Sequence, residues 1–270
     1  MLKVRLIPIV ILKNNLVVQS FGFNRYLPIG KIDAVIEFLV NWDVDEIIVI
    51  DIDATEINRT IAFDTIERVA EKCFVPLTVG GGIRNSDTVS RLLDVGADKI
   101  SLNSAAIETP EFITKISNKY GAQFVVVSID AKKIGPNKYE AFTRNGKVST
   151  NRCPGKLAKE MQDLGAGEIL INSIDNDGMQ GGYDIELLKL VTSSVTVPVI
   201  ACGGVGKAGD LTKGYTEGNC QAVSAANIFN HTELSTIAGK AIMKAAGVPI
   251  RIDSSVKYDN IAFDHLDRPI

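Results

Sequence analysis

The stretch Pro76-Leu77-Thr78-Val79-Gly80-Gly81-Gly82-Ile83-Arg84 decides the fold, because an apolar strand runs directly into three glycines. Backbone without side chains can turn sharply there and expose N–H groups to an anion. A near copy, Pro198-Val199-Ile200-Ala201-Cys202-Gly203-Gly204-Val205, follows 122 residues later. The two loops predict two phosphate sites on one scaffold, and two ordinary strand-to-helix turns are the alternative.

Apolar, β-branched runs alternate with amphipathic stretches along most of the chain. Continuous apolar runs are typical of parallel strands that are covered on both faces. Eight strand–helix units in about 250 residues predict an α/β fold, a closed (β/α)8 or TIM barrel. An open doubly wound sheet is the alternative, but no G-x-G-x-x-G fingerprint opens the first helix. The predicted strands are 5–11, 46–51, 77–79, 99–102, 124–130, 168–174, 199–201 and 222–225.

Two segments depart from this alternation. Residues 134–152 contain a Tyr-Glu-Ala-Phe-Thr run and then Asn145-Gly146, which predicts a small hairpin inserted after the fifth strand. Residues 251–270 follow the single barrel predicted for residues 1–250, and they are polar and mixed. A disordered tail and a docking segment are both open for them. The predicted helices are 34–41, 63–72, 87–95, 110–119, 155–164, 185–192 and 207–217.

The two halves of the chain repeat one another beyond the glycine loops. Residues 45–53, DEIIVIDID, align with residues 167–175, GEILINSID, again 122 residues apart. A half-barrel duplication explains this and places the glycine loops at equivalent positions on opposite sides of one barrel. At a separation of 119 residues, Ile11 at the end of the first strand corresponds to Asp130 at the end of the fifth. A site built from two opposed carboxylates would therefore have kept only one.

Composition narrows the function classes. The chain has 270 residues, 46% hydrophobic and 23% charged, and its net charge of −3 gives no reason to expect nucleic-acid or membrane binding. Four widely spaced cysteines without a C-x-x-C pair indicate free thiols and a cytoplasmic protein. The chain has only two histidines, His231 and His265, which offer little material for a histidine-based metal site. We expect neither a metal nor a cofactor.

Charged and polar residues gather at both ends of the predicted strands. At the carboxyl ends, Asp130 lies between the two glycine loops and could act as a general acid or base on a substrate with a phosphate at each end. Asp53 and Asp175 are as readily read as helix caps. At the opposite end, four strands begin with a charge that could form a closed ring of ion pairs: Arg5, Glu46, Lys99 and Glu168. A structural plug or solvated charges are the alternatives.

These residues and motifs together resemble the HisF-type cyclase subunit of imidazole glycerol phosphate synthase over about residues 1–250. The matching stretches are PLTVGGGIR, GADKISLNSAAI, VVVSIDAK, LGAGEILINSIDNDG and PVIACGGVG. The family is a (β/α)8 barrel with a HisH-like glutaminase subunit at its bottom face, and ammonia passes through the barrel to a bis-phosphate substrate at the top. The resemblance implies that the four-charge ring is the ammonia gate, with Thr78 along the channel and Asp98 at the glutaminase interface. It implies phosphate binding by Gly81, Gly82, Asn103, Ser104, Asp177, Gly178, Gly203, Gly204 and Asn227.

The departures from the family pattern lie at the top. The family's catalytic pair is an aspartate on strand 1 and one on strand 5, and here Ile11 replaces the first while Asp130 keeps the second. The mobile first loop, K-D-G-R-V-V-K-G in the family, reads KNNLVVQS over residues 13–20, and Asn227 stands where the family usually has serine. This pattern indicates a divergent paralogue.

Three functions remain open. Family members that resemble this chain accompany bacterial surface-polysaccharide biosynthesis, where they supply ammonia to a separate amidotransferase that makes an acetamidino sugar. That role is the first hypothesis, with the sugar amidotransferase docked at the top face. The second is the cyclase (lyase) of histidine biosynthesis, which forms imidazole glycerol phosphate and AICAR, with Asp130 as its remaining acid–base group. A non-catalytic scaffold is the third.

Overall fold

The computed structural model describes residues 3–230, 235–259 and 261–270, and eight parallel strands within them close into a barrel. Each strand pairs with the next, and the last pairs with the first through Arg5 opposite Ala222. The barrel predicted from the sequence is confirmed. In order around the barrel its strands are β1 (Arg5–Lys13), β4 (Ile47–Asp51), β5 (Leu77–Gly80), β6 (Lys99–Leu102), β7 (Val125–Gly135), β10 (Glu168–Ser173), β11 (Val199–Cys202) and β12 (Ala222–Ala225).

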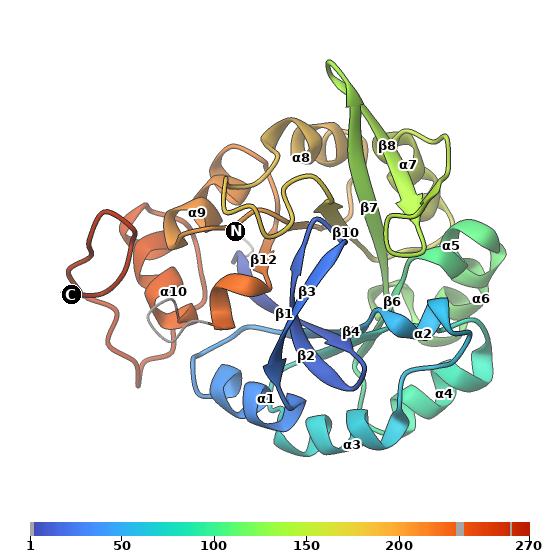
Figure 1. Ribbon diagram of the computed structural model, residues 1–270, viewed down its shortest axis with the longest axis horizontal. Helices are drawn as coiled ribbons and strands as arrows, with labels where there is room; N and C mark the ends of the chain where they lie inside the picture. Colours follow the sequence, from blue (N-terminus) through green and yellow to red (C-terminus); the bar gives the residue numbers. More distant parts are fainter. Residues whose placement is uncertain (1–2, 231–234, 260) are drawn as a thin grey trace.

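Helices form an outer layer around the strands (Figure 1). Their apolar sides, such as Ile66 and Val69 or Val89 and Leu92, are buried against the barrel. The major helices are α1 (Ile32–Val40), α3 (Phe63–Lys72), α4 (Ser86–Asp94), α6 (Glu111–Tyr120), α7 (Pro154–Asp163), α8 (Ile185–Thr192), α9 (Ala208–Thr216) and α10 (Thr236–Ala245). Shorter helical segments are α2 (Asp53–Glu56), α5 (Ser104–Glu108), η1 (Ala122–Phe124) and η2 (Asn227–Asn230).

The segment that corresponds to the family's mobile first loop forms a hairpin after the first strand. β2 (Leu16–Phe21) pairs antiparallel with β1 and with β3 (Arg25–Gly30). Asn14 and Asn15 both have positive φ, the conformation that a tight two-residue hairpin turn requires. Burial of Val17 and Val18 against the core then fixes the hairpin in place across the centre of the barrel (Figure 1).

The hairpin predicted for residues 134–152 is present, with its first turn earlier than expected. β7 continues beyond the barrel and pairs antiparallel with β8 (Lys138–Thr143) across a turn at residues 136–137. Asn145 and Gly146 form the second turn, which leads into β9 (Val148–Ser149). This β7–β8 arm extends away from the barrel in Figure 1.

Aliphatic side chains fill the inside of the barrel. They form a cluster separate from the larger core between strands and helices, and its members include Ile7, Ile48, Val126, Leu170 and Ile200. The described residues contain no helix long and apolar enough to cross a membrane. A packed, largely apolar layer thus separates the two polar ends of the barrel.

The segment after α10 is packed against the barrel. Val4 bridges to Ile250, the backbone N–H of Gly209 donates to the Asp267 carboxylate at 2.8 Å, and Tyr258 is buried. Of the two possibilities left open for residues 251–270, the contacts favour a docked segment over a disordered tail.

Candidate functional site

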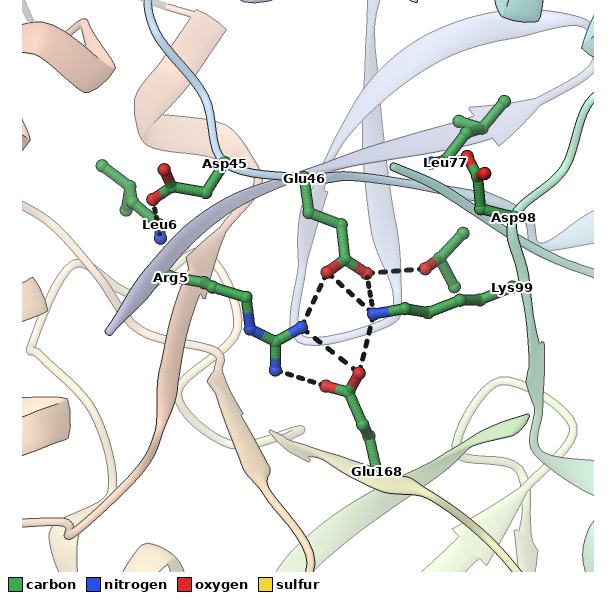
Figure 2. Close-up of polar contacts among 9 residues, drawn as sticks. Arg5, Leu6, Asp45, Glu46, Leu77, Asp98, Lys99 and Glu168 are labelled. Carbon is green, nitrogen blue, oxygen red and sulfur yellow. Dashed lines mark hydrogen bonds and ion pairs between the residues drawn. The ribbon is translucent and has the colours of Figure 1, made fainter. Parts of the chain in front are cut away.

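The four charges at the strand starts form a closed ring, which we call the charged ring: Arg5, Glu46, Lys99 and Glu168 (Figure 2). The guanidinium of Arg5 donates to Glu46 at 2.7 Å and to Glu168 at 2.5 Å. The ammonium of Lys99 donates to Glu168 at 2.7 Å and to both Glu46 oxygens at 3.0 and 3.1 Å. Each cation therefore contacts both carboxylates, and the ring carries no net charge.

The ring is largely removed from water. The side chains of Glu46 and Glu168 are 2% and 9% exposed, while Lys99 is 16% and Arg5 26% exposed. Burial alone would raise the pKa of Glu168, but the hydrogen bonds and charges of Arg5 and Lys99 hold that pKa below its ordinary value. The Glu168 carboxylate consequently stays ionised beside the two cations.

Two side chains beside the ring tie it to the strands. The hydroxyl of Thr78, which lies opposite Lys99 in the sheet register, donates to Glu46 at 2.8 Å. Asp98, which precedes Lys99, is exposed at the barrel bottom and accepts the Leu77 N–H at 2.8 Å. The structure thus brings Thr78 into contact with the ring and leaves Asp98 on the outer face.

A cavity of about 130 Å³ occupies the opposite end of the barrel, where the strands finish. The residues predicted as phosphate ligands all line it, from both halves of the chain: Gly81, Gly82, Asn103, Ser104, Asp177, Gly178, Gly203, Gly204 and Asn227. Asp130 and Ile11 line it as well. Sequence reasoning did not single out Tyr26, Arg84, Arg144 and Asn172, which complete its wall.

The glycine pairs are required by close packing of neighbouring loops. A Cβ on Gly81 would lie 2.4 Å from the carbonyl oxygen of Asp51, and one on Gly82 only 2.1 Å from that of Arg59. In the second half, a Cβ on Gly204 would lie 2.1 Å from the carbonyl oxygen of Gly182. The internal repeat therefore preserves a backbone contact, whether or not an anion binds beside it.

Asp130 stands in an apolar and acidic surrounding. Asn103 donates to its carboxylate at 3.1 Å and to the Ser128 carbonyl at 3.0 Å. Burial, followed by the negative charge of Asp177, raises the pKa of Asp130 to about 7. At the equivalent position of the first half, half-buried Ile11 lies beside Ile50 and offers no carboxylate, and the first-half carboxylate that does line the cavity, Asp51, is paired with Arg59.

The other strand-end aspartates hold backbone or cations. Asp51 pairs with Arg59 at 2.6 Å. Asp53 accepts the Lys13 ammonium at 2.7 Å and the N–H of Asn14 at 2.6 Å, and Asp175 accepts the N–H of Lys133 at 2.7 Å. Asp53 and Asp175 thus secure the extended ends of the first and fifth barrel strands in both halves, and the helix-cap interpretation was wrong for them.

A model of the family described as "Histidine biosynthesis protein" matches residues 5–235. The chain is also 50% identical over all 270 residues to a protein of Vibrio vulnificus (strain YJ016) named "Putative imidazole glycerol phosphate synthase subunit hisF2", of which 98% is covered. The chain belongs to the histidine biosynthesis protein family. Within this family it is similar to HisF-type subunits, as the sequence motifs predicted.

One departure from the HisF pattern, Asn227, has a clear role in the structure. Its carboxamide accepts the Ser20 N–H at 3.1 Å and donates to the Ser20 carbonyl at 2.7 Å, as a neighbouring strand would. Asp177 accepts the Ser20 hydroxyl at 2.5 Å and the Phe23 N–H at 3.3 Å. Both polar side chains of the second predicted phosphate site are thus engaged by the β2–β3 hairpin.

Among the described residues, no group of three or more histidine, cysteine, aspartate or glutamate side chains could hold a metal ion. His231 lies outside the described residues. The polar groups that line the cavity are carboxylates, amides, hydroxyls, backbone and the two guanidinium groups of Arg84 and Arg144.

We predict that Asn227→Ala loosens the β2–β3 hairpin. The substitution removes both hydrogen bonds to Ser20, and amide exchange over residues 16–30 should quicken roughly tenfold. Hydrogen–deuterium exchange with mass spectrometry measures this. Asn41→Ala, which removes an exposed amide contact to Glu37, is the control. Unchanged exchange in the hairpin would show that Asn227 does not hold it.

We predict that Asp130→Asn stabilises the fold at high pH and not at low pH. The folded carboxyl keeps its proton up to about pH 7 against an ordinary pKa of 3.8, so the unfolded chain releases that proton first as pH rises. Stability of the parent chain relative to the variant should therefore fall between about pH 4 and pH 7 and then level off.

Urea unfolding at a series of pH values measures the difference. Asp94→Asn, at the exposed end of α4, is the matched control. A difference between Asp130→Asn and the parent that is independent of pH would contradict a raised pKa at this carboxyl.

Proposed function

We propose that this chain is the ammonia-conducting subunit of a glutamine amidotransferase complex. It receives ammonia from a HisH-like glutaminase subunit at the barrel bottom and conducts it to the top, for amidation of a nucleotide sugar in surface-polysaccharide biosynthesis. A separate sugar amidotransferase would take the ammonia at the top face. One observation carries the proposal: the charged ring is complete, whereas the strand-1 carboxylate of the cyclase is Ile11.

The chemistry of the ring and of the space behind it suits neutral ammonia. Between the charged ring and the cavity, the barrel interior consists of apolar side chains such as Ile7, Ile48 and Leu170. Apolar surroundings strongly disfavour ammonium but admit the uncharged molecule. Lys99 is the ring cation on a flexible stem, and a swing of its side chain would break three hydrogen bonds while Arg5 keeps its contacts to both carboxylates.

The face around the ring has features of a docking surface. Phe74 precedes β5 at the end where the strands begin, and its side chain is 86% exposed. Asp98 is exposed on the same face. An exposed aromatic residue beside charged groups is typical of a protein–protein contact. This supports the glutaminase partner at the barrel bottom.

Binding to the glutaminase subunit tests the proposal. The HisH-like glutaminase encoded in the same genome is mixed with this chain, and the affinity is measured by calorimetry. We expect a complex that Phe74→Ser weakens about tenfold or more. Ile134→Ser is the matched control, because Ile134 is 55% exposed on the β7–β8 arm at the opposite end. Absence of any complex with the parent chain would overturn the proposal.

The histidine-pathway cyclase is the second candidate. It is favoured by the retained cavity and by Asp130, whose pKa of about 7 suits general acid–base catalysis near neutrality. Against it stands Ile11, since the opposed carboxylate is missing on the other wall.

An ammonia-dependent cyclase assay at high pH, without any glutaminase, separates the two candidates. The loss of one of two cooperating acid–base groups predicts turnover about 10²–10⁴-fold below that of a HisF-type cyclase with both aspartates. Such a cyclase, assayed beside this chain, is the control. Near-normal turnover would make the cyclase the leading function.

A further inference from the structure

We propose that the segment after α10 positions the charged ring, through a buried chain of polar contacts that runs from Tyr258 by way of Asp43, Lys240 and Asp45 to Leu6. The role of the charged ring as an ammonia gate rests on the proposed function, whereas the contacts that position the ring do not depend on it. We call four of these residues the tail clamp: Tyr258, Asp43, Lys240 and Asp45. They act on the ring as positioning residues, since none of them is a member of it.

Lys240 is the centre of the tail clamp. Its side chain is 0% exposed, and its ammonium contacts Asp43 at 3.0 Å and Asp45 at 2.9 Å. A buried ammonium needs such partners, and removal of Lys240 would leave two buried carboxylates without this cation. Lys240 therefore binds α10 firmly to the loop between α1 and β4, where both aspartates lie.

Tyr258 extends the contact to the C-terminal segment. Its side chain is buried, its hydroxyl donates to the Asp43 carboxylate, and the same hydroxyl accepts the N–H of Asp253 at 3.4 Å. Burial, followed by the hydrogen bond to Asp43, raises the pKa of Tyr258, so the phenol remains a neutral donor. Asp43 has a φ of +53°, a backbone conformation that its contacts must hold in place.

Asp45 transmits the contact to the ring. One carboxylate oxygen accepts from Lys240, and the other accepts the Leu6 N–H at 2.8 Å (Figure 2). The backbone of Asp45 also donates to the Leu6 carbonyl at 3.2 Å. Leu6 follows Arg5 in the sequence, and Asp45 precedes Glu46. This double contact therefore fixes the backbone next to both ring residues, where β1 and β4 begin.

The same kind of contact recurs elsewhere at the barrel bottom, but without a tail. Asp98 accepts the Leu77 N–H at 2.8 Å, and in the second half Gln221 accepts the Val199 N–H at 3.0 Å. Position 167, the repeat counterpart of Asp45, is Gly167 and has no side chain for this purpose. Of these three side-chain contacts to strand backbone, only the one at Asp45 continues, through Lys240 and Asp43, to a residue beyond α10.

Nuclear magnetic resonance on the isolated chain tests the proposal. Tyr258→Phe keeps the aromatic side chain and removes only its hydroxyl. Lys240→Met removes the charge at the centre of the tail clamp. We expect exchange of the Leu6 amide to quicken about tenfold in Lys240→Met and by a smaller factor in Tyr258→Phe. The guanidinium signals of Arg5, assigned by their loss in Arg5→Lys, should broaden in both variants.

Two controls separate positioning from general destabilisation. The Leu77 amide, which lies on β5 two strands away from β1 and is held by Asp98, should keep its exchange rate. Tyr120→Phe, which removes a hydroxyl contact to Ser90 on the helical layer, should leave Leu6 and Arg5 unchanged. Exchange that quickens equally at Leu6 and Leu77, or an unaltered Arg5 signal, would overturn the proposal. Should Lys240→Met not fold, Tyr258→Phe decides alone.

The experiment uses no glutaminase subunit and no acceptor. A positive result therefore stands even if the glutaminase does not bind, and a negative result leaves the proposed ammonia route untouched.

Discussion

Four charges buried at one end of an apolar barrel are the constraint on which this molecule depends. Arg5 and Lys99 each contact both Glu46 and Glu168, and the loss of any one of them would leave the others short of a partner away from water. Such a ring is costly to build, and a well-packed apolar layer would close the barrel as well. Its completeness therefore indicates a function at this end.

At the opposite end, the two halves of the chain contact one another around the cavity. The β2–β3 hairpin reaches Asp177 and Asn227 in the second half of the chain, and the turn after β8 reaches back toward it, with Phe23 beside Gly146. Residues of both contacts, including Ser20, Phe23 and Asp177, line the cavity. With Ile11 on one wall and Asp130 on the other, it retains the shape of a two-sided site and the acid–base group of only one side.

The parts of this structure that the sequence predicts are those with a local or repeated signal. Apolar runs gave the eight barrel strands, and charges at four strand starts gave the ring, because strand beginnings meet at one end of a barrel whatever the loops do. The turn between β1 and β2 had a local signal in Asn14-Asn15, but the predicted elements did not include it. Lys240 and Asp45 are 195 residues apart, and nothing local pairs them.

The proposed passage of ammonia through the barrel to an acetamidino sugar is tested most directly by isotopic labelling. Permeabilised cells receive glutamine labelled with nitrogen-15 in its amide, together with an excess of unlabelled ammonium, and mass spectrometry reads the acetamidino nitrogen of the surface polysaccharide. Passage through the barrel predicts that this nitrogen comes from glutamine, and that Lys99→Ala shifts it toward the unlabelled pool. An acetamidino nitrogen drawn from the medium with the parent chain would contradict the account.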